Sequence, residues 1–477
     1  MNEPFDVVIV GAGSAGLAAL REVRKRTPNF LLVNDGAWGT TCARVGCMPS
    51  KVLIEAANAY HRRSTFEEFG IRGAAHLSVD LPAVLRRVRR LRDGFVSGTL
   101  AATDNLGERA VAGRARLTGP GRLEVNGREI VARSIVLATG SSPVVPPAWR
   151  SLGDRLFTTD TLFELESLPS RIAVVGLGAI GVEMAQALAR LGINVTAFGR
   201  GHLGGLSDPK VSAAATALLG GEFALHLGAE AEVALIDGNL RVRAGTTEAT
   251  VDAVLAALGR RPNLAGLVLE TLGVALDARG LPPVDPNTLQ VADLPIFLAG
   301  DANGQVPLLH EAADEGHIAG LNAVRLARGE APACFARRTP LSIVFAEPNI
   351  AVVGRRHREL AGTPLIEGEI SFARQGRARA GQRNHGLMRL YAEPETGKLL
   401  GAEMCAPAAE HMAHLLALAL DRGMTVRELL RLPFYHPVLE EGLRSALREL
   451  ASQLPAAGDS DLQSCGGFEG IGAEALD

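Results

Sequence analysis

The feature that most constrains the fold of this chain is a glycine motif, G-x-G-x-x-G, that occurs twice. In both copies a short apolar run, residues 6–10 and residues 172–175, precedes the glycines, and a helical pattern follows them. The glycines are Gly11, Gly13 and Gly16 in the first copy and Gly176, Gly178 and Gly181 in the second. Strand, glycine turn and helix in this order are typical of a dinucleotide-binding unit, because a pyrophosphate can approach the glycine backbone at the helix N-terminus. The sequence therefore predicts an α/β protein with two Rossmann-like dinucleotide-binding domains.

The length of the chain leaves room for a further domain. A chain of 477 residues is too long for one core, and we expect about three domains. After Arg337 the pattern changes to short strands and an amphipathic stretch at residues 408–424, which favours a C-terminal α+β domain. The predicted boundaries are 1–147 and 269–336 for the two segments of the first dinucleotide-binding domain, 148–268 for the second, 337–454 for the C-terminal domain and 455–477 for a disordered tail rich in small and acidic residues.

Charge and hydropathy argue against several kinds of partner. The formal net charge of −3 at pH 7 gives no reason to expect nucleic acid or an anionic membrane. No apolar run approaches the roughly 18 residues that a membrane helix needs. The N-terminus has an acidic residue and no basic region before its apolar run, unlike a secretory signal. We therefore expect a cytoplasmic protein.

Two of the five cysteines, Cys42 and Cys47, lie close together in the segment GTTCARVGCMPSK. Cysteines at this spacing do not share a face of a regular helix, so a bridge needs an irregular turn, for which Gly46 supplies the backbone freedom. Pro49 suits the first turn of the helix that follows. Cys47 is then expected at a helix N-terminus, where its thiolate is stabilised and reactive.

Three interpretations of this pair compete. A zinc site would need about four ligands, and the next histidine or cysteine along the chain is His61, so no metal is predicted. Two unrelated buried thiols are the second interpretation. A redox-active disulfide is favoured, because the pair follows a dinucleotide-binding motif in a chain with few cysteines. The other cysteines are Cys334, Cys405 and Cys465.

Further motifs give the chain a family resemblance. In order along the chain they are GAGSAG, TCARVGCMPSK, ATGSSP, GLGAIGVE, LGRRPN, AGDANG, VFAEPNIAVVG and YHPVLEE. With these motifs the chain resembles the pyridine nucleotide–disulfide oxidoreductases, which include dihydrolipoamide dehydrogenase, glutathione reductase and mercuric reductase. The resemblance extends from about residue 6 to about residue 450 and leaves only the tail outside. It implies bound FAD, a nicotinamide nucleotide and a homodimer formed by the C-terminal domain.

The resemblance also implies catalytic roles. Cys42 would be the thiol that meets the substrate, and Cys47 the thiol that lies against the flavin. Lys51 would lie near flavin N5 and pair with Glu183. His436 and Glu441 would be an acid–base dyad that serves the cysteines of the partner subunit, and histidine can accept a thiol proton near neutral pH.

Cofactor-binding residues follow from the matched motifs. For FAD the expected residues are Gly11, Gly13, Gly16, Asn34, Asp35, Lys51, Ala115, Thr139, Gly140, Asp301, Leu309 and His310. For NAD(P) they are Gly176, Gly178, Gly181, Glu183, Gly199, Arg200 and Gly259. Asn34 stands where an acidic residue normally holds the ribose, and its amide can still bond a hydroxyl. Asp301 would bind the ribityl and phosphate part of FAD.

Gly199 and Arg200 bear on the choice of nicotinamide. An acidic ribose-binding residue is absent at this position, which removes repulsion toward a 2′-phosphate, and Arg200 can accommodate one. This favours NADP(H). The first motif has lost its acid too, and Gly181 is not the alanine typical of NADP sites, so NAD(H) stays open.

The sequence constrains the identity of the substrate less than it constrains the fold or the cofactors. The best-supported reaction is of the dihydrolipoamide dehydrogenase type, although Phe434 stands where those enzymes carry another histidine. The alternative is an NADPH-dependent reductase of a small disulfide. Mercuric reductase is disfavoured because only Cys465 lies near the C-terminus, and a transhydrogenase because both paired cysteines are present. A non-catalytic flavin-binding redox sensor is the alternative from a different class.

Overall fold

The structure is a computed structural model that describes residues 3–455. The predicted tail, from residue 456 on, and Cys465 within it lie outside the described residues. The chain divides into two compact units, one made of Met1–Gly201 and Gly220–Arg337 and the other of His202–Leu219 and Arg338–Asp477. Each unit is described by itself.

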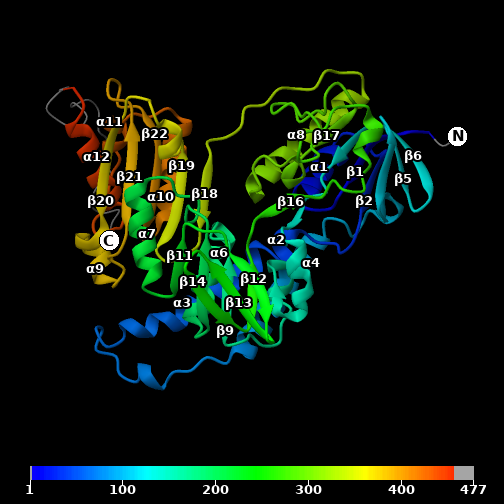
Figure 1. Cartoon of the computed structure of the whole chain (residues 1–477). Coiled ribbons are helices and arrows are strands. Elements are labelled where there is room, and N and C mark those ends of the chain that lie inside the picture. The colour runs from blue at the N-terminus through cyan, green and yellow to red at the C-terminus, as the bar shows by residue number, and fades with distance from the viewer. Residues whose placement is uncertain (1–2, 456–477) are drawn as a thin grey trace. The chain divides into compact units, whose positions relative to one another are not determined.

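The first unit contains a parallel sheet built around the first glycine motif (Figure 1). Its order is β3-β2-β1-β6, β17 pairs with the other side of β6, and β4 and β5 extend β6 as antiparallel strands. The strands are β1 (Phe5–Val10), β2 (Phe30–Asn34), β3 (Ala110–Ala112), β4 (Ala115–Gly119), β5 (Arg122–Val125), β6 (Arg128–Leu137) and β17 (Ile296–Leu298). Since β1 and β2 are apolar and buried along most of their length, both faces of this sheet are covered, as in other parallel sheets.

Two helices pack together beside this sheet, α1 (Ser14–Arg24) and α8 (Leu309–Ala327). Their close approach depends on glycine: a Cβ on Gly316 would lie 2.1 Å from the Ala15 carbonyl oxygen, and one on Gly320 would lie 2.6 Å from that of Ala19. Only residues without a side chain fit this contact. The helix α8, far along the chain, is thereby held against the helix that follows the first glycine motif.

A second parallel sheet follows the second glycine motif, with the order β11-β10-β9-β15-β8. Its strands are β8 (Leu156–Phe157), β9 (Arg171–Val175), β10 (Asn194–Gly199), β11 (Ala224–Leu227) and β15 (Ala253–Ala256). A three-stranded antiparallel sheet of β12 (Glu232–Ile236), β13 (Asn239–Ala244) and β14 (Thr247–Val251) accompanies it, and β7 (Ser141–Pro143) pairs with β16 (Arg260–Pro262). Helix α6 (Ala179–Arg190) begins at the second glycine motif. The two dinucleotide-binding folds predicted from the glycine motifs are thus both present.

The remaining helices of the first unit include α2 (Thr41–Arg44) and α3 (Cys47–His61), which contain the cysteine pair. The others are α4 (Leu81–Leu100) and α5 (Thr159–Leu162), with the short 3-10 helices η1 (Arg62–Thr65), η2 (Ala74–His76), η3 (Gly107–Arg109), η4 (Pro147–Arg155), η5 (Leu269–Leu272) and η6 (Gly300–Asn303). Asp80 caps α4 by accepting a hydrogen bond from the Ala83 N–H. Helix α3 packs against both α4 and α6, so the cysteine segment is held between elements of the two nucleotide folds.

The second unit is built on an antiparallel sheet with the order β18-β19-β22-β21-β20 (Figure 1). The strands are β18 (Leu341–Val344), β19 (Asn349–Gly354), β20 (Ile366–Ser371), β21 (Leu387–Ala392) and β22 (Leu399–Ala406). The helices are α7 (Pro209–Gly220), α9 (Gly376–Ala380), α10 (Ala409–Asp421), α11 (Val426–Leu430) and α12 (Glu441–Ser452), with 3-10 helices η7 (His357–Leu360) and η8 (Phe372–Arg374). This is the α+β arrangement expected for the C-terminal part of the chain.

The two faces of this sheet differ because side chains alternate along each strand. In β21, Met388 and Leu390 belong to the core cluster that α10 and α12 complete. Arg389 and Tyr391 therefore point to the opposite face, where both are buried. The segment 202–219 approaches that second face, since Arg389 pairs with Asp208.

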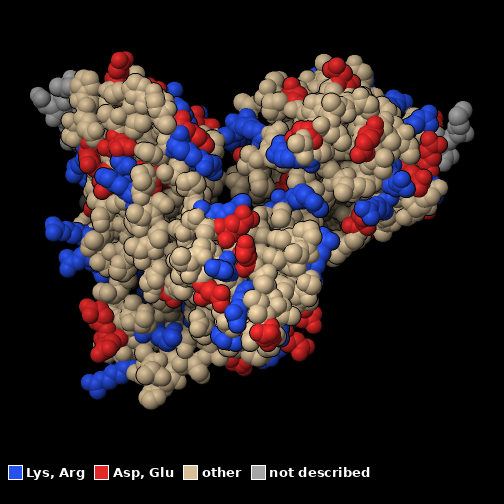
Figure 2. Space-filling view, in the orientation of Figure 1, with Lys and Arg blue, Asp and Glu red and all other residues tan. Residues whose placement is uncertain are grey.

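The surface carries charges of both signs. On the face shown in Figure 2, basic and acidic side chains of the described residues are interspersed rather than gathered into one large region of one sign. In the described part of the chain, every helix is too short or too polar to cross a membrane.

Candidate active site

The first glycine loop makes an open cradle at the start of α1. Gly11 has a φ of +107°, and a Cβ there would lie 2.2 Å from the Ala138 carbonyl oxygen; a Cβ on Gly16 would lie 1.8 Å from the Gly11 carbonyl oxygen. Gly13 differs, because a Cβ there would meet nothing within 4 Å. Two glycines thus allow the turn and the close packing, and the third borders open space that a pyrophosphate can enter.

The second loop repeats this geometry. A Cβ on Gly176 would lie 2.3 Å from the Ala257 carbonyl oxygen, and one on Gly181 would lie 1.7 Å from the Gly176 carbonyl oxygen. Gly178 again borders open space. In both loops, therefore, the first and third glycines are required by close backbone contacts, and the second glycine borders open space.

Both cradles fit a dinucleotide electrostatically. The N-cap residues of α1 and α6 are Gly13 and Gly178, and neither supplies a side-chain cap or is followed by an acid in the first turn. The first N–H groups of each helix are thus available to an anion. Thr139, whose backbone nitrogen lies 3.1 Å from the position of a Cβ on Gly11, has a buried hydroxyl with no hydrogen-bond partner among the described residues, as expected if a bound ligand provides that partner.

Asn34 ends β2 and is used by the loop itself. Its Oδ1 accepts a hydrogen bond from the Ala12 N–H at 3.0 Å, and its Nδ2 donates to the Gly36 carbonyl at 3.3 Å. Asp35 beside it is exposed, and its Oδ2 lies 3.9 Å from Arg114 Nε. The amide of Asn34 therefore ties the strand end to the glycine loop, and its expected contact with the ribose stays a prediction.

Asp301 lies in the turn η6 and is oriented by two residues from other segments. Its Oδ2 accepts a hydrogen bond from the Ser141 hydroxyl at 2.5 Å. Arg260 in turn donates to the Ser141 hydroxyl at 2.8 Å and to its carbonyl oxygen at 2.7 Å. Ser141 and Arg260 belong to the ATGSSP and LGRRPN motifs, but no role was predicted for either, because sequence does not show that these motifs meet.

The other residues expected to bind cofactor lie at the ends of elements in the first unit. Gly140 has a φ of +69° and Gly259 a φ of +94°, both in connections that leave strands. Leu309 and His310 are exposed in the first turn of α8, whereas Ala115 is buried in β4. Their contacts with FAD or NAD(P) remain predictions.

The cysteine pair lies across a break between two helices. Helix α2 ends at Arg44, and α3 begins at Cys47, as the sequence predicts. Gly46 fills the break, and a Cβ there would lie 3.1 Å from the Thr41 carbonyl oxygen and 3.3 Å from the Cys42 Cα. The absence of a side chain at Gly46 therefore lets Cys42 come near Cys47.

Cys42 and Cys47 are both free thiols in the structure. The predicted disulfide is thus not formed here, and it remains a prediction for the oxidised protein. Hydrogen bonding by the neighbouring Cys42 thiol lowers the pKa of Cys47 to about 7; burial opposes this and the charge of Lys51 assists it. The same hydrogen bonding, together with burial, raises the pKa of Cys42. The pair therefore holds one readily formed thiolate, on Cys47.

Lys51 follows one helical turn after Cys47 and pairs with Glu183 of α6. Lys51 Nζ lies 2.9 Å from Glu183 Oε1 and 2.7 Å from Oε2. Glu183 is buried. This pair was expected from the family resemblance, and it places a cation beside the cysteines.

His436 and Glu441 form a dyad in the second unit. His436 Nδ1 lies 2.9 Å from Glu441 Oε1, and Glu441 Oε2 accepts a hydrogen bond from the Val438 N–H at 3.2 Å. The hydrogen bond with His436 holds the pKa of Glu441 below its usual value. The His436 side chain is 80% exposed, and the nitrogen that contacts Glu441 is Nδ1. A carboxylate that fixes Nδ1 leaves Nε2 free to exchange a proton.

At the end of β10, Gly199 has tight surroundings. A Cβ there would lie 3.1 Å from side-chain carbons of both Leu177 and Leu227. Arg200 follows and is exposed. The position where an acid would repel a 2′-phosphate is therefore closed to larger side chains.

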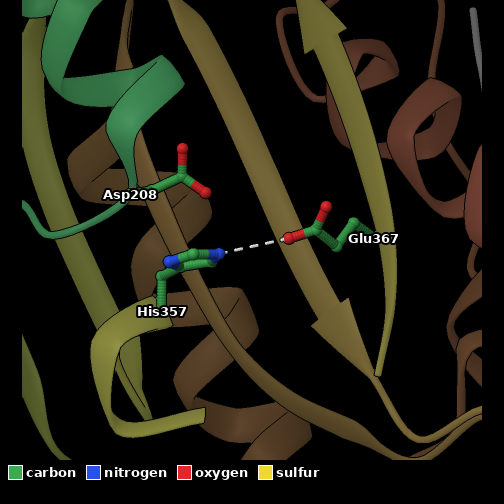
Figure 3. Close-up of side chains that lie close together, drawn as sticks. All are labelled: Asp208, His357 and Glu367. Atoms are coloured by element: carbon green, nitrogen blue, oxygen red, sulfur yellow. Dashed lines mark ion pairs between the residues drawn. The ribbon is translucent and has the colours of Figure 1, made fainter. Parts of the chain in front are cut away.

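One group of described residues has the spacing of metal ligands: Asp208, His357 and Glu367 of the second unit (Figure 3). His357 Nε2 lies 3.3 Å from Glu367 Oε1, as the dashed line marks. Figure 3 shows that the three side chains come from separate segments and converge.

The carboxylate of Asp208 is already saturated. Its Oδ2 accepts from Arg389 at 2.6 Å and from the Tyr391 hydroxyl at 2.8 Å, and its Oδ1 accepts from the N–H groups of Lys210 at 2.9 Å and Val211 at 3.2 Å. Burial alone would raise the pKa of Asp208, but these donors, Tyr391 first, hold it below its usual value. Since four donors fill the acceptor positions of a carboxylate, this cluster is an ion-pair network that anchors the segment 202–219 to the sheet.

Comparison with known proteins agrees with this geometry. The model of the pyridine nucleotide-disulphide oxidoreductases matches residues 5–316, and the model of their dimerisation domain matches residues 341–447. The chain belongs to the pyridine nucleotide-disulphide oxidoreductases. The predicted family, fold class and cofactors are confirmed: members contain FAD and use NAD(P) as the pyridine nucleotide. The dimerisation domain supports the predicted homodimer.

Similar proteins within the family differ in activity. A mercuric reductase of Acidithiobacillus ferrooxidans is 32% identical over 98% of this chain and 85% of its own length. A dihydrolipoyl dehydrogenase of Bacillus subtilis is 30% identical over 92% of this chain and 97% of its own length. Among solved structures, LpdA of Mycobacterium tuberculosis has a TM-score of 0.79 at 26% identity, covering 93% of this chain and 99% of that one. The Cu(II) complex of the flavoprotein disulfide reductase RclA of Escherichia coli has a TM-score of 0.79 at 23% identity, covering 94% and 99%, and shows the shared fold.

Proposed function

We propose that this protein transfers two electrons between a nicotinamide nucleotide and a small dithiol or disulfide through Cys42 and Cys47. The observation that carries the proposal is the placement of the two thiols across the break at Gly46, with Cys42 in α2 and Cys47 at the N-terminus of α3. The pKa of Cys47 there is lowered to about 7. Structural cysteines are usually inert, whereas a lowered pKa beside a cation marks a reactive one.

The two cysteines have different roles in the proposed reaction. In the oxidised protein they form a disulfide, and a substrate thiolate attacks the Cys42 sulfur, so that the bond between the cysteines breaks. Cys47 leaves as a thiolate, which its low pKa favours. The second substrate thiol then displaces Cys42 from the mixed disulfide. The substrate loses two electrons and two protons; the pair gains both electrons.

The protons have defined destinations. Because the pKa of Cys42 is raised, Cys42 keeps one proton as a thiol. His436 takes the other through Nε2, while Glu441 holds Nδ1. We assign this dyad to the cysteines of the partner subunit, and the exposed His436 side chain supports an intersubunit role.

Bound FAD would supply the two-electron chemistry that couples the reduced cysteines to the nicotinamide. The Gly11–Gly16 loop, Thr139 and Asp301 would hold FAD, and the Gly176–Gly181 loop with Arg200 would hold the nicotinamide nucleotide. The Lys51–Glu183 pair would stand between the cysteines and the nicotinamide domain.

The substrate we propose is a dihydrolipoamide-type dithiol, oxidised with NAD(P)⁺. Gly199 and Arg200 favour a second candidate that runs in reverse, an NADPH-dependent reductase of a small disulfide, since this position lacks an acid that would repel a 2′-phosphate. A cysteine pair that must cycle between the dithiol and the disulfide suits a reducing compartment, so we propose that the protein is cytoplasmic.

Initial rates decide between these candidates. Purified holoenzyme is assayed with dihydrolipoamide and each oxidised nicotinamide, and with each reduced nicotinamide and lipoamide, glutathione disulfide or Hg²⁺. The proposal expects the highest rate with dihydrolipoamide and loss of that rate in Cys42→Ser. If every rate equals that of Cys42→Ser, the thiol chemistry is refuted. A yellow protein that NADH and NADPH both fail to bleach indicates the non-catalytic sensor instead.

A further inference from the structure

A buried carboxylate lies behind the turn that carries Asp301. Glu315 on α8 is 3% exposed. Its Oε2 accepts hydrogen bonds from the Gly300 N–H at 2.7 Å and from Asn303 Nδ2 at 2.6 Å. Its Oε1 accepts from Arg337 Nη2. One carboxylate thus holds both ends of the turn η6.

The same stretch of α8 also contacts the helix of the first glycine loop. Gly316 packs directly on the Ala15 backbone, and Gly300 lies so near that a Cβ on it would be 2.9 Å from the Ala15 Cβ. The turn 300–303 and the loop 11–16 are therefore positioned against each other by α8. These are the two segments expected to hold the phosphates and the ribityl chain of FAD.

We propose that Glu315 is a positioning residue for FAD: its carboxylate fixes the Asp301 turn relative to the first glycine loop and thereby sets the affinity for the cofactor. The proposal rests on FAD occupying this cradle. Glu315 reaches no open space itself and acts through Gly300 and Asn303. Its role differs from that of Ser141, which orients the Asp301 carboxylate directly.

The site requires a carboxylate and not an amide. All three groups that face Glu315 are donors: the Gly300 N–H, Asn303 Nδ2 and Arg337. Asn303 cannot reverse its amide without loss, because its Oδ1 accepts from the Gln305 N–H at 2.9 Å. A glutamine at position 315 would set its own NH₂ against a donor in either orientation, and a buried unpaired donor is costly.

Glu311 provides a matched control. It lies one helical turn earlier on α8, is also buried, and pairs with the same Arg337 at 2.8 Å. Among the described residues, its hydrogen-bond partner is Arg337 and not a residue of the turn 300–303. Glu311→Gln therefore weakens the same ion-pair cluster without touching the Asp301 turn.

The test compares full-length wild type, Glu315→Gln and Glu311→Gln. Each is stripped of flavin, its melting temperature is followed by circular dichroism, and FAD binding is titrated by quenching of flavin fluorescence. We expect both apoproteins to fold, Glu315→Gln to melt at the lower temperature because of its buried unpaired donor, and the Kd for FAD to rise about tenfold or more in Glu315→Gln only. Equal Kd values for the two variants would overturn the positioning role.

If Glu315→Gln does not fold, Asn303→Ala provides a second test of the proposal. Asn303→Ala removes one of the two bonds from the turn to Glu315 while the carboxylate stays, and its Kd for FAD should rise by a smaller factor. An unchanged Kd in folded Asn303→Ala counts against the proposal. If the wild-type protein binds no FAD, the proposed FAD site itself is refuted. If the wild-type protein binds FAD and Glu315→Gln binds it equally well, only the positioning role of Glu315 is refuted.

Discussion

Lys51 on α3 and Glu183 on α6 are joined by two short contacts, 2.9 Å and 2.7 Å from Lys51 Nζ to the two carboxylate oxygens. The pair links the helix that begins at Cys47 to the helix that begins at the second glycine motif. With 7% of the Glu183 side chain and 29% of the Lys51 side chain exposed, solvent screens this pair less than a surface pair. It therefore contributes both to stability and to the charge beside the cysteines.

Glu183→Gln should destabilise the protein by about 1.5–3 kcal/mol, because a charged hydrogen bond is lost and Lys51 keeps its charge in a half-buried position. Chemical denaturation measures the change. Glu55→Gln on the exposed side of α3 is the control and should stay within about 0.5 kcal/mol of wild type. If both variants unfold at the same denaturant concentration as wild type, the pair adds no stability.

Alkylation of the reduced protein should depend on pH. Cys47 has a pKa of about 7, so lowering the pH through 7 protonates its thiolate and slows its reaction with iodoacetamide, while Cys42, whose pKa is raised, reacts slowly throughout this range. Mass spectrometry of labelled peptides follows each cysteine. Lys51→Met should move the midpoint for Cys47 upward, since a nearby cation is removed; Lys398→Met, at an exposed site in the second unit, should leave it in place. A midpoint unmoved in Lys51→Met would show that its charge does not act on Cys47.

Gly46→Ala should disturb the cysteine pair. Its new Cβ would lie 3.3 Å from the Cys42 Cα and 3.1 Å from the Thr41 carbonyl oxygen, so the backbone between the cysteines must shift. We expect a loss of about 1–3 kcal/mol and a lower fraction of Cys42–Cys47 disulfide after oxidation. Gly98→Ala in α4 is the matched control: its Cβ meets nothing within 4 Å, and helix propensity should stabilise it by about 0.5–1 kcal/mol. Equal disulfide yields in both variants would contradict the role of Gly46.

The sequence predicted the parts of the site that depend on local backbone. The glycine loops and the break at Gly46 follow from residues adjacent in the chain, because only glycine permits these turns and close contacts. Cys47 at the start of α3 is confirmed for the same reason.

The parts that join distant segments could not be predicted. Ser141, Arg260 and Glu315 position the Asp301 turn from three separate stretches, and nothing in a single sequence pairs them. The segment 202–219 was expected within the second dinucleotide-binding domain, but the structure groups it with the C-terminal sheet, where Asp208 bonds Arg389 and Tyr391. From the sequence alone, Asp208 is indistinguishable from an ordinary turn residue, because its partners Arg389 and Tyr391 are far away along the chain.

Arg200→Ala tests the choice of nicotinamide. If Arg200 binds a 2′-phosphate, its loss should raise KM for NADPH by about 10- to 150-fold, the loss of a charge-assisted hydrogen bond, and leave KM for NADH nearly unchanged. Steady-state kinetics with both nucleotides measures this. Arg243→Ala, an exposed arginine on β13, controls for loss of surface charge and should affect neither. Equal changes for both nucleotides in Arg200→Ala would remove Arg200 as the discriminating residue.

Subunit mixing tests the assignment of the His436–Glu441 dyad to the partner's cysteines. Cys42→Ser and His436→Gln homodimers should each be almost inactive, since each lacks an essential group in both sites. In a heterodimer of the two variants with intersubunit sites, one site collects both lesions and the other has neither. Activity should then return toward half that of wild type per dimer.

The alternative arrangement, in which each His436 serves the cysteines of its own chain, predicts a different result. Every site of the heterodimer then carries one lesion, so activity stays at the level of the parents. Differently tagged chains allow purification of the heterodimer, and flavin absorbance establishes that each chain retains FAD. Because Glu441 holds Nδ1 of His436 and the His436 side chain is exposed, Glu441→Gln mixed with Cys42→Ser should restore activity in the same way. Verified heterodimers that stay inactive in both mixtures would refute the intersubunit site.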